Sequence, residues 1–130
     1  MVKQDNFKLT REHVKEALLA YLQKNPRSGY DALEWVFDEV GFSWRGELVI
    51  CSADNPNIVF WEGWNEAAIT LINELTKAEL IVKEPAIWVE RLTFGRVPAL
   101  PIVKRYYQYR TEHWLPVVFS LAEDCTKAEE

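Results

Sequence analysis

A helix that passes almost directly into a strand is the feature that most constrains the fold of this chain. Residues 65–85 read NEAAITLINELTKAELIVKEP. Apolar side chains recur in the first part of this stretch at helical spacing, and Asn65 stands where a helix cap is expected. These apolar residues are Ala68, Leu71, Ile72 and Leu75. A short apolar run begins at Leu80, and a strand-rich segment follows, so the order predicts a small α+β domain.

Capping and turn residues divide the rest of the chain into short elements. Helices are expected over residues 11–24 and 29–40, the first capped by Thr10 and the second ended by Gly41. Strands are expected over residues 47–52, 58–61, 80–82, 87–94, 102–110 and 114–121. The first two strands are predicted to form a hairpin. Pro116 confines the last strand to a sheet edge or a bulge.

The length and composition are those of one globular domain. The chain has 130 residues, of which 48% are hydrophobic and 27% are charged. We expect a single α+β domain over residues 1–121, with three helices and a mostly antiparallel sheet, and an acidic, flexible tail over residues 122–130. Cys51 and Cys125 are too few for a disulfide framework. The sequence shows no signal peptide and no apolar stretch of membrane-spanning length, so the predicted location is cytoplasmic.

The net charge of −5 hides a strong asymmetry along the chain. Residues 91–110 contain only basic side chains among their charged residues. These are Arg91, Arg96, Lys104, Arg105 and Arg110. The rest of the chain is acidic overall, so this segment is the natural candidate for contact with an anionic partner.

The segment AITLINELTKAELIVKEP resembles the end of a winged helix-turn-helix domain, where a third helix is followed by the first strand of a β-hairpin wing. The resemblance covers roughly residues 65–121, with a loosely matching pair of helices before it. It implies a winged-helix-like fold, in which the third helix enters the major groove of DNA and the wing touches the backbone or the minor groove. Two features depart from the family. Glu79 stands where a helix-ending glycine is usual, and the predicted hairpin separates the second helix from the third.

The basic segment is also rich in tyrosine. The run KRYYQYR, residues 104–110, would alternate its side chains across a strand. One face would carry Lys104, Tyr106, Gln108 and Arg110, and the other Arg105, Tyr107 and Tyr109. Cations beside aromatic rings suit nucleic acid, because the cations meet phosphates and the rings stack on unpaired bases. Two other interpretations stay open: charges that protect an edge strand from aggregation, and contact with the acidic surface of a protein partner.

Residues that could carry chemistry show no catalytic spacing. His13 and His113 belong to no metal-binding pattern and are expected at the surface, whereas Cys51 is expected to be a small buried residue. Trp61-Glu62-Gly63-Trp64 is the most unusual string, because its tryptophans would either fill the core or line a pocket. We therefore expect a protein that is no enzyme and uses no metal and no cofactor.

The leading hypothesis is a small non-enzymatic DNA-binding or regulatory protein, of the kind that acts in transcription regulation. The basic residues would contact phosphates, and two tyrosines would stack on bases or position the cations. The predicted site is Arg91, Arg96, Lys104, Arg105, Tyr106, Tyr109 and Arg110. The third helix is subordinate, because its outward positions hold two acids against one base. The alternative is a homodimeric protein-interaction module without nucleic-acid binding.

Overall fold

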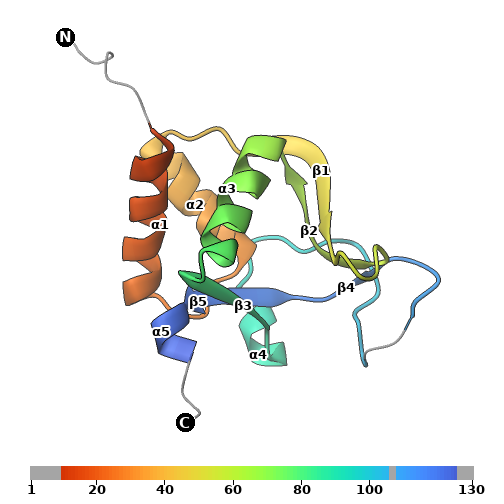
Figure 1. The fold of residues 1–130 in the computed structure, drawn as a ribbon. Helices are drawn as coiled ribbons and strands as arrows, with labels where there is room; N and C mark the ends of the chain where they lie inside the picture. Colours follow the sequence, from red (N-terminus) through yellow and green to blue (C-terminus); the bar gives the residue numbers. More distant parts are fainter. Residues whose placement is uncertain (1–9, 106–107, 126–130) are drawn as a thin grey trace.

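The computed structural model describes residues 10–105 and 108–125 of the chain (Figure 1). In chain order the elements are α1 (Arg11–Lys24), α2 (Tyr30–Val40), β1 (Arg45–Cys51), β2 (Ile58–Trp64), α3 (Glu66–Lys77), β3 (Ile81–Pro85), α4 (Trp88–Arg91), β4 (His113–Trp114), β5 (Val117–Leu121) and α5 (Ala122–Cys125). Figure 1 shows α1, α2 and α3 gathered together, with the β1–β2 hairpin on one side and the paired β3 and β5 below them. The predicted α+β class is confirmed.

Three predicted capping residues, Thr10, Gly41 and Asn65, stand at ends of the three longer helices, whereas α2 begins after Gly29 without a side-chain cap. The Thr10 hydroxyl accepts a hydrogen bond from the backbone N–H of His13 (3.1 Å), and the Asn65 side chain accepts one from that of Ala68 (2.8 Å). Gly41 ends α2 with φ of 80°, a left-handed conformation that glycine adopts without strain. None of the helices in the described part of the chain is long and apolar enough to cross a membrane.

The strands form two small sheets. β1 pairs with β2 in the predicted antiparallel hairpin, and the short β4 lies parallel to the start of β2. β3 pairs antiparallel with β5, from Ile81 opposite Leu121 to Pro85 opposite Val117. The strand that follows α3 therefore takes its partner from the far end of the described chain. The winged-helix resemblance stays a prediction.

The predicted strand over residues 87–94 is wrong. The structure has α4 and a turn there, because the Glu90 carboxylate folds back and accepts a hydrogen bond from the backbone N–H of Ile87 (2.9 Å). Such a contact three residues apart stabilises a helix start and leaves the backbone unable to pair as a strand.

The predicted strand over residues 102–110 is also wrong where the structure describes it. A single bridge joins Ile102 to Trp114, and residues 103–105 and 108–110, which the structure describes, belong to no strand. The predicted strand over residues 114–121 is interrupted at Pro116, whose nitrogen has no hydrogen to donate to a ladder, and it resumes as β5. After it, the first four residues of the predicted tail form α5, and residues 126–130 lie outside the described part.

An aromatic core joins α2 to both sheets. The Tyr30 ring stacks on Trp61 with 5.8 Å between ring centroids, and it meets Trp64 and Phe119 edge to face. Trp61 is 1% exposed and Trp64 is fully buried, so these two tryptophans fill the core. Burial raises the pKa of Tyr30, because the charged phenolate would lose its hydration there.

Candidate functional site

The structure separates the residues of the predicted basic site, because Arg96 is engaged within the protein. Its Nη1 donates to both carboxylate oxygens of Glu34 at 2.8 Å. Its Nη2 donates to the backbone carbonyl of Glu62 (2.7 Å), and its guanidinium carbon lies 4.8 Å from the centre of the Trp61 ring. These contacts pair the charge of Arg96 with Glu34, so we assign Arg96 a structural role in the domain.

Glu34 is a buried carboxylate with an unusual set of donors. Its side chain is 9% exposed, and its Oε2 accepts hydrogen bonds from the indole Nε1 of Trp61 (2.8 Å) and of Trp64 (2.9 Å) as well as from Arg96. Buried charges persist in proteins when they are paired and fully hydrogen-bonded, and this one satisfies both conditions. Its partners stand 27, 30 and 62 residues away, so no local motif could have indicated the cluster.

Lys104, Arg105 and Arg110 are exposed on a loop between Ile102 and β4, at the right of Figure 1. We call these three residues the cationic loop. Within the part of the chain that the structure describes, no carboxylate lies at ion-pair distance from any of the three. The three positive charges of the cationic loop are therefore available to an anionic partner, as the sequence predicted. The predicted strand that would have aligned their side chains is not found in the described residues.

Tyr109 holds the cationic loop in shape. Its ring is 8% exposed and stacks on His113 with 3.9 Å between ring centroids. Its hydroxyl donates to the carbonyl of Arg105 (2.7 Å) and accepts from the backbone N–H of Lys104 (3.1 Å). Of the two roles predicted for Tyr109, stacking on bases or positioning cations, the buried ring fits positioning alone. Tyr106 lies outside the described residues.

An exposed apolar surface lies on and beside α4. Trp88 is 67% exposed and Leu92 is 72% exposed, and the neighbouring Ile87 and Val89 are 56% and 45% exposed. We call these four residues the α4 platform. Clusters of large, solvent-exposed apolar side chains mark interaction surfaces, because a partner that covers them removes apolar area from water and gains free energy. Arg91, another predicted site residue, ends the helix, and no carboxylate in the described residues lies at ion-pair distance from it.

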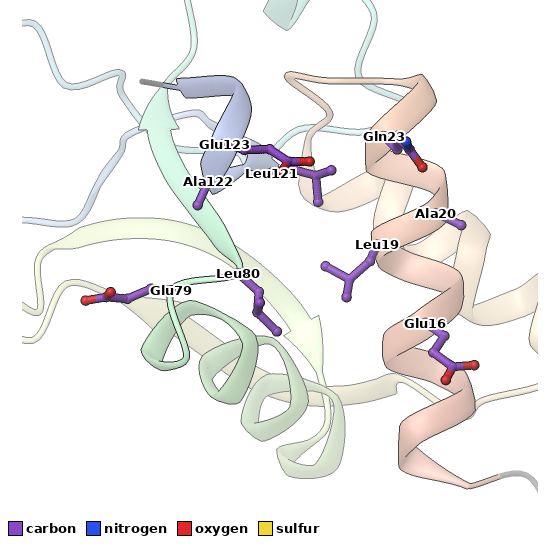
Figure 2. Close-up of a pocket in the computed structure, with 9 residues that line it drawn as sticks. All are labelled: Glu16, Leu19, Ala20, Gln23, Glu79, Leu80, Leu121, Ala122 and Glu123. Atoms are coloured by element: carbon purple, nitrogen blue, oxygen red, sulfur yellow. The ribbon is translucent and has the colours of Figure 1, made fainter. Parts of the chain in front are cut away.

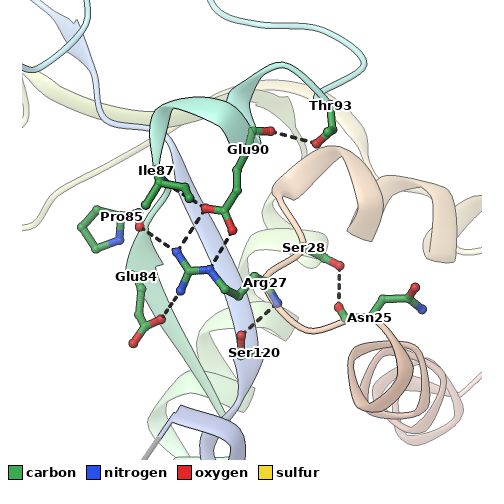
Figure 3. Close-up of polar contacts among 9 residues, drawn as sticks. All are labelled: Asn25, Arg27, Ser28, Glu84, Pro85, Ile87, Glu90, Thr93 and Ser120. Atoms are coloured by element: carbon green, nitrogen blue, oxygen red, sulfur yellow. Dashed lines mark hydrogen bonds and ion pairs between the residues drawn. The ribbon is translucent and has the colours of Figure 1, made fainter.

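Arg27 fastens α4 to the rest of the domain, as Figure 3 shows. Its guanidinium donates to both oxygens of Glu90, at 2.7 Å and 3.1 Å, and to Glu84 at 2.7 Å. We call the contacts of Arg27 with Glu84 and Glu90 the Arg27 clamp. The backbone N–H of Arg27 donates to the Ser120 hydroxyl (2.9 Å), which anchors the clamp on β5. The hydrogen bonds between Arg27 and Glu90 lower the pKa of Glu90 and raise the pKa of Arg27. The Arg27 contacts thus hold α4 in place while the α4 platform faces solvent.

The α4 platform was not predicted from the sequence, because residues 87–94 were expected to form a strand. A signal was present, since apolar residues fell on both faces of the supposed strand. A strand with one face in water keeps that face polar, and Glu90 three residues after Ile87 also fits a helix start.

The residues considered for chemistry do not converge. His13 is exposed on α1, as expected, and His113 is partly buried against Tyr109. The predicted burial of Cys51 is wrong, because Cys51 ends the edge strand β1, whose side chains mostly face water. In residues 10–105 and 108–125, no three side chains of histidine, cysteine, aspartate or glutamate form a group that could hold a metal ion.

No protein-family model matches this chain, and no curated protein or solved structure matches it either.

Proposed function

We propose that this chain is a protein-interaction module that forms a homodimer through the α4 platform. The observation that carries the proposal is the exposure of Trp88 (67%) and Leu92 (72%) on a helix that an Arg27–Glu90 clamp holds in place. A second copy of the chain is the proposed partner, because it offers the same apolar side chains to a two-fold contact.

Apolar burial by a rigid surface would stabilise the dimer. Covering a large apolar side chain contributes roughly 1.5–3 kcal/mol, and tryptophan is a common hot spot at interfaces. Binding costs less when the surface is already ordered, because few side chains and little backbone have to be fixed on association. The clamp supplies this order through Glu90 and Glu84.

The first test changes the α4 platform by Trp88→Ala together with Leu92→Ala. We expect the wild-type chain to sediment as a dimer at about 100 μM, and the double variant to associate about 30-fold more weakly, which corresponds to roughly 2 kcal/mol. Analytical ultracentrifugation over a concentration series measures both. Trp35→Ala is the matched control, because Trp35 is 55% exposed on α2 and lies outside the platform. A wild-type monomer throughout the series, or an equal loss in the control, would contradict the homodimer.

A second candidate function, nucleic-acid binding, is favoured by the cationic loop. Lys104 and Arg105 also line a surface hollow with Pro101, Ile102, Tyr109 and His113. The His113 Nδ1 donates to the carbonyl of Thr111 (2.9 Å) and so helps to shape this hollow. Exposed cations that form no ion pair within the described part of their own chain can neutralise phosphates. The proposed phosphate contacts are Lys104, Arg105 and Arg110, with Arg91 as a further candidate.

The second test measures DNA binding against salt. If three cations meet phosphates, the logarithm of the affinity should fall with the logarithm of salt concentration with a slope of about −3. Lys104→Glu with Arg105→Glu should abolish detectable binding, whereas Lys24→Glu with Lys77→Glu changes the net charge equally on exposed helix ends and should change it little. Fluorescence anisotropy with labelled duplex and single-stranded DNA reports both. Absence of binding at low ionic strength would remove this candidate and leave the homodimer untouched.

The wider role stays part of the proposal. A cytoplasmic regulatory protein, with the winged-helix resemblance in α3 and β3, is compatible with either candidate. The ultracentrifugation and anisotropy experiments use different variants, so each candidate succeeds or fails without the other.

A further inference from the structure

A hollow beside β4 brings together two cations that the predicted strand would have separated. It has a volume of about 700 Å³ and is lined by Pro101, Ile102, Lys104, Arg105, Tyr109 and His113. We call these six residues the cationic hollow. Lys104 and Arg105 are neighbours in the sequence, and neighbouring side chains of a strand point to opposite faces. The loop instead lets both side chains line one hollow, so their charges can act on a single anion.

Hydrogen bonds hold the backbone on both sides of the cationic hollow. On one side, the N–H of Trp114 donates to the carbonyl of Pro101 (2.7 Å). On the other side, the Asn57 side chain donates to the carbonyl of Tyr109 (2.8 Å), and the carbonyl of Asn57 accepts from the N–H of His113 (2.7 Å). The walls of the hollow are thus tied to β4 and to the residue that precedes β2.

Tyr109 positions the two cations. Its hydroxyl accepts a hydrogen bond from the backbone N–H of Lys104 (3.1 Å) and donates to the carbonyl of Arg105 (2.7 Å). The Tyr109 ring is itself buried and stacks on His113. The backbone from which both cations project is therefore fixed before a ligand arrives, and binding costs less when the binding groups are already in place.

Two other hollows lack this pattern of charge. The groove in Figure 2 lies between α1 and the end formed by β3, β5 and α5, and Leu19 points into it from α1. No Lys, Arg or His is among the described residues that line this groove. A hollow beside α2 has two arginines in its lining, but also the carboxylates of Asp31, Glu34 and Asp38. The described lining of the cationic hollow has two cations and no acid, which favours an anionic ligand.

A terminal phosphate suits the cationic hollow better than a phosphate within a strand. A phosphate monoester carries a charge of about −1.5 to −2 at pH 7 and has three acceptor oxygens. A phosphate within a nucleic-acid strand carries a single negative charge. Two cations that line one hollow therefore gain more from the monoester. A monoester also has a substituent on one side only, so it can enter a concave site end-on.

We propose that the cationic hollow binds a phosphate monoester, whose oxygens Lys104 and Arg105 contact. The attached sugar would pack against Pro101 and Ile102. The monoester is the phosphorylated end of a nucleic-acid strand or a free nucleotide. The inference deepens the nucleic-acid candidate and rests on the proposal that the cationic loop meets phosphates. Arg110 belongs to the cationic loop but does not line the hollow, so it would contact a phosphate within the strand.

The first experiment compares short single-stranded oligonucleotides of one sequence, titrated against the full chain by fluorescence anisotropy. One pair has a phosphate or a hydroxyl group at the 5′ end and fluorescein at the 3′ end. A second pair has the phosphate or hydroxyl group at the 3′ end and the label at the 5′ end. We expect at least one phosphorylated strand to bind about 10-fold more tightly than its hydroxyl partner. Equal affinities within both pairs would overturn the inference.

Matched variants identify the hollow as the site of this preference. Lys104→Ala with Arg105→Ala should reduce the preference to within about 2-fold. Lys24→Ala with Lys77→Ala removes the same charge from exposed helix ends and should preserve it. Arg110→Ala should weaken the phosphorylated and hydroxyl strands equally and leave their ratio unchanged. A preference that survives the Lys104, Arg105 variant would contradict the assignment to this hollow.

Tyr109→Phe tests the positioning role of the hydroxyl. Phenylalanine keeps the ring that stacks on His113 but removes the hydrogen bonds to Lys104 and Arg105. We expect the preference for the phosphorylated strand to fall to about 3-fold, with the affinity for the hydroxyl strand little changed. An equal loss for both strands would count against the inference, because a hydroxyl that only supports the loop would affect both alike.

NMR titration with adenosine 5′-monophosphate, with adenosine as the control, separates the two sources of the monoester. We expect amide shifts at Lys104, Arg105 and Tyr109 with the nucleotide alone. If these shifts occur and no strand binds, the ligand is a free nucleotide and only the nucleic-acid candidate fails. If phosphorylated and hydroxyl strands bind equally, that candidate stands and the inference fails. Shifts outside the hollow, an equal response to adenosine, or no response to any phosphorylated probe would also overturn the inference.

Discussion

Replacing Glu34 by alanine should lower the free energy of unfolding by about 3–5 kcal/mol. The substitution leaves the indole N–H groups of Trp61 and Trp64 without their acceptor inside the core, and it strips Arg96 of its carboxylate partner. An unpaired buried donor costs roughly 1–3 kcal/mol, and two such donors are created at once. Urea denaturation followed by tryptophan fluorescence measures the change directly, because Trp61 and Trp64 are themselves in the cluster.

Glu34→Gln is the matched comparison for this prediction. Glutamine keeps one oxygen as an acceptor for an indole, but its neutral amide gives up the charge that holds Arg96. We expect it to cost about half as much as alanine. A loss below about 1 kcal/mol for Glu34→Ala would show that water or a shifted side chain satisfies the two tryptophans, and that the cluster does not hold α2 to β2.

Gly46→Ala should lower the free energy of unfolding by about 3 kcal/mol. A Cβ atom at Gly46 would stand 2.7 Å from the Cα of Asn65 and 2.7 Å from the carbonyl oxygen of Trp64. Both are backbone atoms at the junction of β2 and α3, where the N–H of Asn65 also donates to the carbonyl of Trp44 (2.7 Å). They cannot yield as a flexible side chain would, so the hairpin has to move away from α3. Urea denaturation checks the value.

Gly95→Ala provides the control for the effect of glycine replacement itself. A Cβ atom at Gly95 would lie 3.6 Å from its nearest neighbour, a carboxylate oxygen of Asp31, which is ordinary contact. The N–H of Gly95 would still donate to Asp31. We expect a change within about 0.5 kcal/mol. Equal losses at both glycines would mean that the close approach of β1 to the junction does not set the cost at Gly46.

Elements that depend on neighbouring residues were predicted well. Helical spacing and the capping residues Thr10, Asn65 and Gly41 gave α1, α2 and α3, and loop residues between two β-rich runs gave the β1–β2 hairpin. These signals work because a helix cap or a tight turn is a contact between residues three or four apart. The same information is fully present in the sequence.

Elements that depend on distant partners were predicted poorly. Residues 87–94 and 102–110 contain β-forming residues, but in the part of the chain that the structure describes they pair with no strand beyond the single bridge of Ile102 with Trp114. The backbone near Glu90 and Tyr109 is instead held by hydrogen bonds from these two side chains. The basic segment was identified by its charge alone, and the charge of a residue does not show whether a carboxylate of the folded protein pairs with it. The structure engages Arg96 with Glu34 and leaves Lys104, Arg105 and Arg110 in solvent.

By itself, the sequence determined the class of the domain, its three longer helices and the location of its positive charge. Tertiary structure decided which charges stay available and that α4 carries its apolar residues into solvent on an Arg27 clamp. The reason is physical. Periodicity and capping act over a few residues, whereas pairing, burial and desolvation depend on groups that only folding brings together.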